Sequence, residues 1–342
     1  MMKYWPRIQD VAELSEVSKA TVDRVMHERP GVSRKTKKRV FDAVEELQRR
    51  GMTPNQIKYT NLHLNFSFII QSGPVFAERI SKEIDKVFPK FSKYGVSISK
   101  SFMTGLDLQK IEDEIIRTGS DCDGVVVICQ EDTFISNAIK KLVKQDVQVV
   151  SISNDIPDAP ILGCVKMDQL KAGYTAGTLL GRFIGKSKGD VAVMVSGKFR
   201  CQQEREMGFR QTLRDKFPLL NITEIIHTQD NNESSYKMMR DYFQAGNRPL
   251  GIYNTTGGIK GVADAISEFT EPGNQIVYIC HELTDIAKDL LLRGKIDAVI
   301  DHDAEIEITL ALKHLINFRI PRTFDVNFDP LPIRIYLPEN TF

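Results

Sequence analysis

Cysteine and tryptophan are scarce in this sequence, which has 5 Cys and 1 Trp among 342 residues. The cysteines are widely separated, odd in number and form no Cys-x-x-Cys pair. This pattern argues against a disulfide framework or a structural zinc site. It favours a reducing compartment, and we expect a cytoplasmic protein.

Long hydrophobic runs are also missing. The longest are short segments such as residues 125–129, whereas a membrane-spanning helix needs about 20 apolar residues. Residues 1–6 lack the apolar core of a secretion signal. We therefore expect neither a transmembrane segment nor a secretion signal.

A strong overall charge is absent, because the formal net charge is only +1. The charge is nevertheless unevenly distributed. Residues 1–60 contain 13 Lys and Arg against 8 Asp and Glu, a balance of +5, and the remaining 33 and 37 give −4. A basic N-terminal segment on a mildly acidic body suggests a nucleic-acid partner, although many solvated helices carry a similar surplus.

The first 50 residues are rich in helix signals. Apolar side chains gather on one face of residues 8–16, and Ser18 is a suitable N-cap for a second helix that runs to about His27. Pro30 and Gly31 indicate a turn, after which Ser33 can cap a third helix. Three short helices with a tight turn between the first two predict a helix-turn-helix unit.

From Leu64 onward, strand patterns alternate with helix patterns. We expect strands at residues 65–70, 96–102, 124–129, 147–152, 191–195, 222–227, 251–253, 275–280 and 298–300, with helices between them. This alternation is typical of parallel sheets, and nine repeats exceed one doubly wound sheet. The sequence therefore predicts two α/β lobes with a cleft at the carboxyl ends of their strands. The expected division is a helix-turn-helix domain at 1–50, a linker at 51–63 and a two-lobed domain at 64–342.

The N-terminal motifs resemble the lactose/galactose repressor (LacI/GalR) family. The matching segments are residues 8–13, 17–25, 30–33, 39–40, 43–47 and 54–55. The match extends over about 50 residues, and the α/β body is similar to that family's periplasmic-binding-protein-like (type I) sugar sensor. The resemblance implies a cytoplasmic homodimer that binds pseudo-palindromic operator DNA and a small polar effector.

The second helix is the expected recognition helix. Its exposed face offers Lys19 and Arg24, whose side chains can reach base edges in the major groove. The resemblance implies that Lys19, Ala20 and Arg24 face bases, while Ser18 and Thr21 face phosphates. Asp23 departs from the usual Ser of the family, and we expect it either to accept from cytosine or to pair with Arg24.

The linker departs further from the family pattern. Asn55 matches the family, but Lys58 and Asn61 stand where the family has Ala and a Leu that wedges into the minor groove. Leu62 lies one position late. Either Leu62 substitutes as the wedge, or the linker kinks the operator weakly or is a plain tether.

In the body, Arg205 with Gly208 and Phe209 resembles the family stretch whose Arg enters the cleft. A guanidinium group suits vicinal hydroxyls or a carboxylate, although a surface salt bridge is the alternative. Asn254 ends a predicted strand and can donate and accept, or cap the next helix. The other candidates lie near the carboxyl ends of strands: Gln71, Ser72, Phe76, Ser153, Asn154, Asp155, His281, Glu282 and His302. In the family, Asp usually stands at the position of Glu282 and Gln often at that of His302; Phe76 suits a core position equally well.

Two other chemistries are not supported by the sequence. Residues 181–187 lack the spacing of a nucleotide-binding Walker loop and lie at the end of a predicted helix. His281, Glu282, His302 and Asp303 could suggest a metal, but no motif such as His-Glu-x-x-His is present. We expect no metal, no cofactor and no catalytic residues.

The sequence therefore predicts a DNA-binding transcriptional regulator. The family resemblance implies a repressor that its effector releases from DNA, which is the commoner behaviour in the family, with co-repression as the alternative. The effector is expected to be a sugar, a polyol or a sugar acid. Two rivals share the α/β body. A solute-binding protein of a transporter needs a secretion signal and no N-terminal helices, and a sugar-metabolising enzyme needs a catalytic motif.

Overall fold

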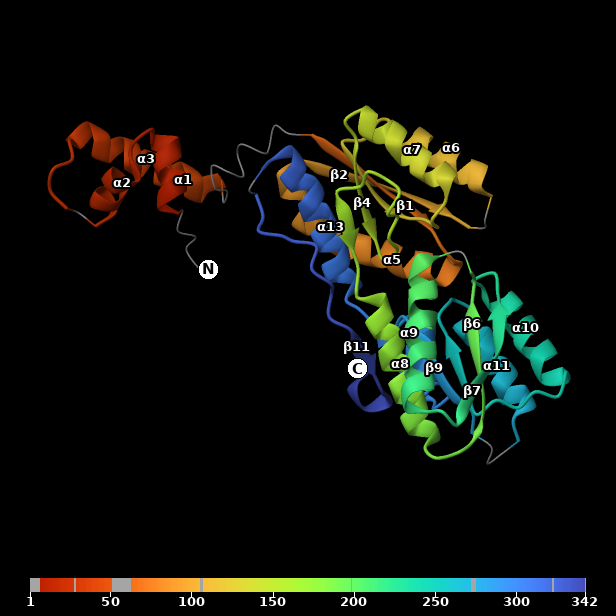
Figure 1. The fold of residues 1–342 in the computed structure, drawn as a ribbon. Helices are drawn as coiled ribbons and strands as arrows, with labels where there is room; N and C mark the ends of the chain where they lie inside the picture. The colour runs from red at the N-terminus through yellow and green to blue at the C-terminus, as the bar shows by residue number, and fades with distance from the viewer. Residues whose placement is uncertain are drawn as a thin grey trace. The chain divides into compact units, whose positions relative to one another are not determined.

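The computed structural model describes residues 7–27, 29–50, 63–104, 107–197, 199–271, 275–321 and 323–341. They comprise an N-terminal helical unit and an α/β body (Figure 1). The predicted domain limits at residues 50 and 63 adjoin residues 51–62, which lie outside the described residues, and these limits remain predictions.

The helical unit contains α1 (Ile8–Ser15), α2 (Lys19–Met26) and α3 (Arg34–Arg50). Both predicted N-caps are confirmed: the Ser18 hydroxyl accepts from the Thr21 amide at 3.2 Å, and the Ser33 hydroxyl accepts from the Thr36 amide at 3.1 Å. One apolar face of each helix is buried in a small common core, which contains Val11, Ala12, Val22, Val25, Val40, Ala43, Val44 and Leu47.

The N-terminal lobe of the body is a five-stranded sheet in the order β2-β1-β3-β4-β5. Its strands are β1 (Leu64–Gln71), β2 (Val96–Met103), β3 (Gly124–Ile128), β4 (Gln148–Ile152) and β5 (Gly163–Val165). Its helices are α5 (Pro74–Val87), α6 (Leu108–Gly119), α7 (Thr133–Lys144) and α13 (Ala304–Arg319), the last of which returns from the far end of the chain (Figure 1).

The C-terminal lobe is a six-stranded sheet in the order β11-β10-β9-β8-β6-β7. Its strands are β6 (Gly189–Val195), β7 (Leu220–His227), β8 (Gly251–Asn254), β9 (Val277–His281), β10 (Ala298–Asp301) and β11 (Arg334–Tyr336). Its helices are α8 (Gln169–Ile184), α9 (Arg200–Lys216), α10 (Asn232–Gln244), α11 (Ile259–Phe269) and α12 (Asp285–Leu292). All its strand pairs are parallel except β10 with β11.

The predicted fold class is confirmed, with two kinds of difference. The strands β5 and β11 were not predicted, because three residues are too few to establish a pattern. Between the first two strands, the residue pattern predicts a helix at 78–93, whereas α5 begins at Pro74 and ends at Val87. Proline is well suited to the first position of a helix, and after Val87 the chain continues as a short 3-10 helix at Phe88–Lys90.

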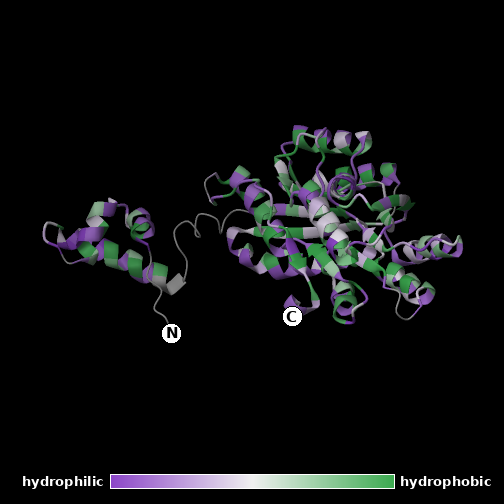
Figure 2. Ribbon diagram, turned by 60° about the horizontal axis from the view of Figure 1, so that its bottom comes forward, coloured by the Kyte–Doolittle hydropathy of each residue, from purple (hydrophilic) through white to green (hydrophobic). Residues whose placement is uncertain are grey.

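The chain crosses between the lobes at residues 166–168, 302–303 and 320–333, so the lobes are joined beside β5 and β10. Hydrophobic residues gather on the strands and on one side of the surrounding helices (Figure 2). None of the described helices is long and apolar enough to cross a membrane.

Candidate functional site: the recognition helix and the interlobe cleft

The exposed face of α2 carries the residues predicted to contact DNA. Ser18, Lys19, Ala20 and Arg24 are exposed, and Thr21 is half-buried. The Lys19 ammonium donates to Oε1 of Gln9 in α1 at 3.0 Å. The predicted linker residues Asn55, Asn61 and Leu62 lie outside the described residues.

Of the two alternatives expected for Asp23, the pair with Arg24 is not formed, and the contact with cytosine stays a prediction. Its carboxylate instead contacts the Arg29 guanidinium at 3.0 Å and His27 Nδ1 at 3.1 Å. Both partners follow the C-terminal end of α2, where a cation is favoured by the helix dipole. Asp23 thus ties the end of the recognition helix to the following turn.

A cleft between the two lobes contains two neighbouring cavities of about 60 and 320 Å³. Both are lined by Gln71, Ser72, Gly73, Phe199, Asp230 and Asn231. The smaller one is lined by apolar side chains, such as Val75, Phe76 and Ile128, and by polar side chains from both lobes. Such a mixed lining suits a ligand that has both an apolar face and hydroxyl groups.

Arg205 is the buried cation of this cleft, with only 2% of its surface exposed. It projects from α9, and its Nε donates to Oε1 of Gln169 at 2.7 Å while Nη1 donates to the Thr255 carbonyl at 3.2 Å. Gly173 and Gly208 let α8 and α9 approach closely, since a Cβ on either would lie 2.1 Å from a backbone oxygen of the other helix. The close helix pair therefore sets the position of Arg205.

Glu282 faces Arg205 from the end of β9, with 3.8 Å between Oε1 and Nη1. Burial raises the pKa of the Glu282 carboxyl, while the positive charges of Arg205 and Arg79 oppose this shift. Both groups line the smaller cavity, so a ligand bound there would meet a guanidinium and a carboxylate side by side.

Three non-glycine residues of the cleft have left-handed backbone conformations. The φ angles are 60° at Ser153, 61° at Asp230 and 72° at Glu282. Each residue lies just beyond the carboxyl end of a strand, namely β4, β7 and β9. Backbone strain of this kind is often concentrated at ligand sites.

Seven of the eleven predicted ligand residues line the smaller cavity. They are Gln71, Ser72, Phe76, Ser153, Asn154, Arg205 and Glu282. The structure brings these residues together from both lobes, although several of their polar atoms already bond to protein. The Asn154 side chain, for example, donates through Nδ2 to the Cys129 carbonyl at 2.6 Å. Its Oδ1 accepts from the backbone amide of Cys201 at 2.9 Å.

Asp155 and Asn254 do not line either cavity. The Asp155 carboxylate contacts the Lys166 ammonium at 3.1 Å and caps the Ile156 amide at 2.9 Å. The Asn254 side chain accepts from the Thr256 amide and donates to the Tyr278 hydroxyl, so it supports the loop after β8. In both cases the polar atoms of the side chain bond to neighbouring protein groups and not to the space of the cleft.

The two predicted histidines also lie outside both cavities. His281 is buried with Nε2 at 2.6 Å from the Tyr253 hydroxyl, and burial lowers its pKa well below the usual value. His302 bonds through Nε2 to Glu307 at 3.0 Å. Glu307 also accepts from the amide and hydroxyl of Ser153, so His302 belongs to a buried network beside a crossover.

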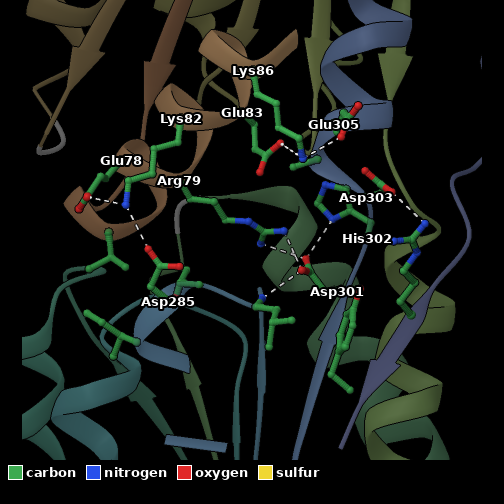
Figure 3. A pocket seen from close by; sticks show the side chains of 17 residues that line it. Glu78, Arg79, Lys82, Glu83, Lys86, Asp285, Asp301, His302, Asp303 and Glu305 are labelled. Atoms are coloured by element: carbon green, nitrogen blue, oxygen red, sulfur yellow. Dashed lines mark hydrogen bonds and ion pairs between the residues drawn. The ribbon is translucent and has the colours of Figure 1, made fainter. Parts of the chain in front are cut away.

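A separate, charged pocket of about 330 Å³ lies between α5 and the C-terminal lobe (Figure 3). Arg79 donates two bonds to Asp301, at 3.1 and 2.7 Å. Lys82 contacts Asp285 at 3.0 Å, and Lys86 contacts Glu305 at 2.8 Å. Each of these three cations is therefore already paired with a carboxylate of the pocket.

The sequence interpretation missed Asp230 and Asn231, as well as Gln202, Thr255 and Thr256, which all line the smaller cavity. The loop at residues 228–231 follows a strand that we had predicted. The rule that ligands bind at the carboxyl ends of parallel strands could therefore have indicated this loop, although not which of its residues lines the cavity.

Comparison with known families agrees with this architecture. Residues 68–318 match the family described as "Periplasmic binding protein domain", and residues 7–49 match "Bacterial regulatory proteins, lacI family". The chain belongs to the LacI family of bacterial regulators, with a periplasmic-binding-protein body. Its α1–α3 unit is thus the DNA-binding head of a transcriptional regulator, and its body is a periplasmic binding protein domain.

Two curated relatives from Bacillus subtilis (strain 168) are similar over most of their length. The first, "Probable HTH-type transcriptional repressor ExuR", is 25% identical over 72% of each chain, and "HTH-type transcriptional regulator DegA" is 23% identical over 66% of each. Two solved structures share the body fold. A LacI transcriptional regulator from Bacteroides fragilis aligns with a TM-score of 0.71 at 18% identity, covering 82% of this chain and 98% of that one. GanP, a glucose-galactose binding protein from Geobacillus stearothermophilus, aligns with a TM-score of 0.73 at 16% identity over 82% and 99%.

Proposed function

We propose that this regulator acts as a homodimeric repressor in the cytoplasm, and that a small polyhydroxylated effector bound in the interlobe cleft controls its affinity for operator DNA. The observation that carries the proposal is the position of Arg205. It is a buried guanidinium at the meeting point of the two lobes, in a chain that also has a DNA-binding head.

The effector is a sugar, a polyol or a sugar acid. Support comes from the cleft, which is lined by polar side chains from both lobes and by Val75, Phe76 and Ile128. Proteins with the same fold include a glucose-galactose binding protein and solute-binding proteins in complex with D-allose and D-arabinose. A guanidinium such as that of Arg205 also suits the carboxylate of a sugar acid.

Within the proposal, Arg205 and Glu282 bind ligand hydroxyls from the C-terminal lobe, while Gln71, Ser72, Ser153 and Asn154 contact the ligand from the N-terminal lobe. Phe76 packs on an apolar face of the effector. The remaining predicted residues do not contact the ligand and act only through the protein partners described above. They are Asp155, Asn254, His281 and His302.

The head binds DNA through Lys19, Ala20 and Arg24 at base edges and through Ser18 and Thr21 at phosphates. Support comes from their exposure on α2, since a recognition helix contacts bases with the side chains of its N-terminal part. Asn55, with Asn61 and Leu62 of the linker, contacts the operator centre.

Two experiments on the full-length protein test this function. Thermal-shift screening against neutral sugars, polyols and uronic acids should find a ligand, because a ligand at 100 times its Kd adds about 2.7 kcal/mol of stability. Selection from a random duplex library should then yield a pseudo-palindromic site whose binding changes when that ligand is added. An operator affinity that no stabilising ligand alters would contradict the proposal.

A further inference from the structure

Asp230 connects the two lobes through one hydrogen bond. Its Oδ2 accepts from the backbone amide of Gly73 at 2.9 Å. Gly73 precedes α5 in the N-terminal lobe, whereas Asp230 follows β7 in the C-terminal lobe. The two residues are 157 positions apart in the chain, so only tertiary structure brings them together.

The bond is placed at a favourable point of α5. The Ala77 amide donates to the Gly73 carbonyl at 3.0 Å, which makes Gly73 the residue that begins the helix. The carboxylate of Asp230 therefore lies at the positive end of a 14-residue helix. A side chain at Gly73 would prevent this approach, since a Cβ there would lie 2.1 Å from the Asp230 carbonyl oxygen.

Asp230 is rigidly positioned by its own lobe. Its Oδ1 accepts from the Gly257 amide at 2.6 Å and from the Thr256 hydroxyl. These bonds leave Oδ2 directed at the other lobe. The strained φ of 61° also indicates that the surrounding structure determines this conformation.

The sheet topology places this bond far from the points where the lobes are joined. One crossover leaves β10, and β7 lies four strand positions away in the sheet, or roughly 19 Å at the usual spacing between strands. Another crossover leaves β5, three positions from β1, or roughly 14 Å. If the lobes rotated about the crossovers, Asp230 and Gly73 would therefore move apart further than groups that lie beside a crossover. The Arg79–Asp301 pair differs, because Asp301 ends β10 beside a crossover.

We propose that Asp230 is the closure residue of the body: its carboxylate fastens the C-terminal lobe to the first turn of α5 and favours the closed arrangement of the lobes. Because Asp230 also lines both cavities, the arrangement it favours is the one that encloses the cleft. This role does not depend on which effector binds, and it makes Asp230 a positioning residue rather than a ligand-contacting one.

The test compares full-length Asp230→Gly and Asp230→Asn with wild type in the absence of added ligand. Glycine suits a φ of 61° and asparagine tolerates it, so neither variant strains the backbone. The control is Asp297→Asn, which alters a carboxylate that accepts the Tyr278 amide at 2.7 Å within its own lobe. Amide hydrogen exchange and small-angle X-ray scattering are measured on each protein.

We expect the peptide that contains Gly73 to exchange at least about tenfold faster in Asp230→Gly, in line with the loss of a charge-assisted hydrogen bond. The radius of gyration should increase in that variant and to a smaller degree in Asp230→Asn, but not in Asp297→Asn. Faster exchange with an unchanged radius would overturn the proposal, since the bond would then protect one amide without holding the lobes. Exchange that accelerates throughout β7, α10 and α11 would also overturn it, because that result indicates local unfolding.

Discussion

Arg205 and Glu282 face each other across 3.8 Å inside the cleft, although α9 and β9 bring them from positions 77 residues apart, 282 minus 205. Among the described residues of the cleft, the opposite charge nearest to each of them is the other. Arg205 is almost completely buried. An effector that inserts hydroxyl groups between them would bind to preorganised charges. The first prediction concerns this pair.

Arg205→Ala should weaken effector binding by roughly ten- to a hundredfold, because it leaves a ligand group without its charged partner. Operator affinity without effector should stay near that of wild type, since the DNA-binding residues lie in the head. Isothermal titration calorimetry and operator gel shifts measure the two affinities. Arg210→Ala is the matched control, because Arg210 lies on the same helix but is exposed and paired with Glu206 of that helix. An unchanged effector affinity in Arg205→Ala would remove Arg205 from the site.

Arg24→Ala should cost about 1–3 kcal/mol of operator binding and relax the preference for one base pair in each half-site. Arg24 is exposed on α2, where a guanidinium can reach guanine O6 and N7. Binding is measured against cognate and scrambled operators. Lys38→Ala, a change at an exposed residue of α3, should weaken both duplexes to a similar extent or not at all. If Arg24→Ala kept the wild-type ratio between the duplexes, its role in base recognition would be wrong.

Asn61→Leu should tighten operator binding or increase DNA bending, because an apolar side chain can unstack a central base step. This prediction depends on the sequence alone, in which Asn61 stands where the family has its wedge residue. Circular-permutation gel shifts report the bend angle. Unchanged bending in Asn61→Leu, together with a large loss of affinity in Leu62→Ala, would identify Leu62 as the existing wedge.

His302 should make the folded state less stable as the pH rises above neutrality. Burial lowers the pKa of His302, but the charge and hydrogen bond of Glu307 and the charge of Asp301 outweigh burial and the nearby Arg79, so the net pKa is raised. A raised folded-state pKa means that protonated His302 stabilises the fold below the unfolded pKa of about 6.5, and that this contribution is lost as the pH rises through the folded pKa.

Urea denaturation of wild type and His302→Gln between pH 6 and 9 measures this contribution. The stability difference between the two proteins should be largest at pH 6 and shrink toward pH 9. His314→Gln is the control of opposite sign, because burial lowers the pKa of His314 and its neutral form is the stabilising one. A wild-type advantage over His302→Gln that grows with pH would contradict the assignment.

Local patterns were sufficient to predict most of the fold. Ser18 and Ser33 could be identified as N-caps because capping depends on residues only three positions apart. The alternation of strands and helices likewise reports burial along each segment, and it predicted both α/β lobes. Where a segment was short, as in β5 and β11, the same patterns contained too few residues to be informative.

The residues that line the cleft could be predicted only partly from the sequence. Position after a strand indicated that Gln71, Arg205 and Glu282 belong together, because parallel strands bring their carboxyl ends to one edge. It could not say which side chain points into the cavity. Asp155 and His302 fulfil the same rule yet turn to Lys166 and Glu307, since a buried charge or imidazole takes the nearest complementary partner.

Asp230 shows what only tertiary structure could decide. Its sequence neighbours mark it as one polar residue of a loop, and nothing local distinguishes it from Gln229 or Asn231. Its role follows from the fold, which brings the amide of Gly73 within 2.9 Å of its carboxylate. The sequence therefore determined the helical head, the two lobes and the kind of chemistry at their strand ends. The tertiary structure decided which of those groups meet, because the direction of a side chain and the distance to its partner depend on packing between segments far apart in the chain.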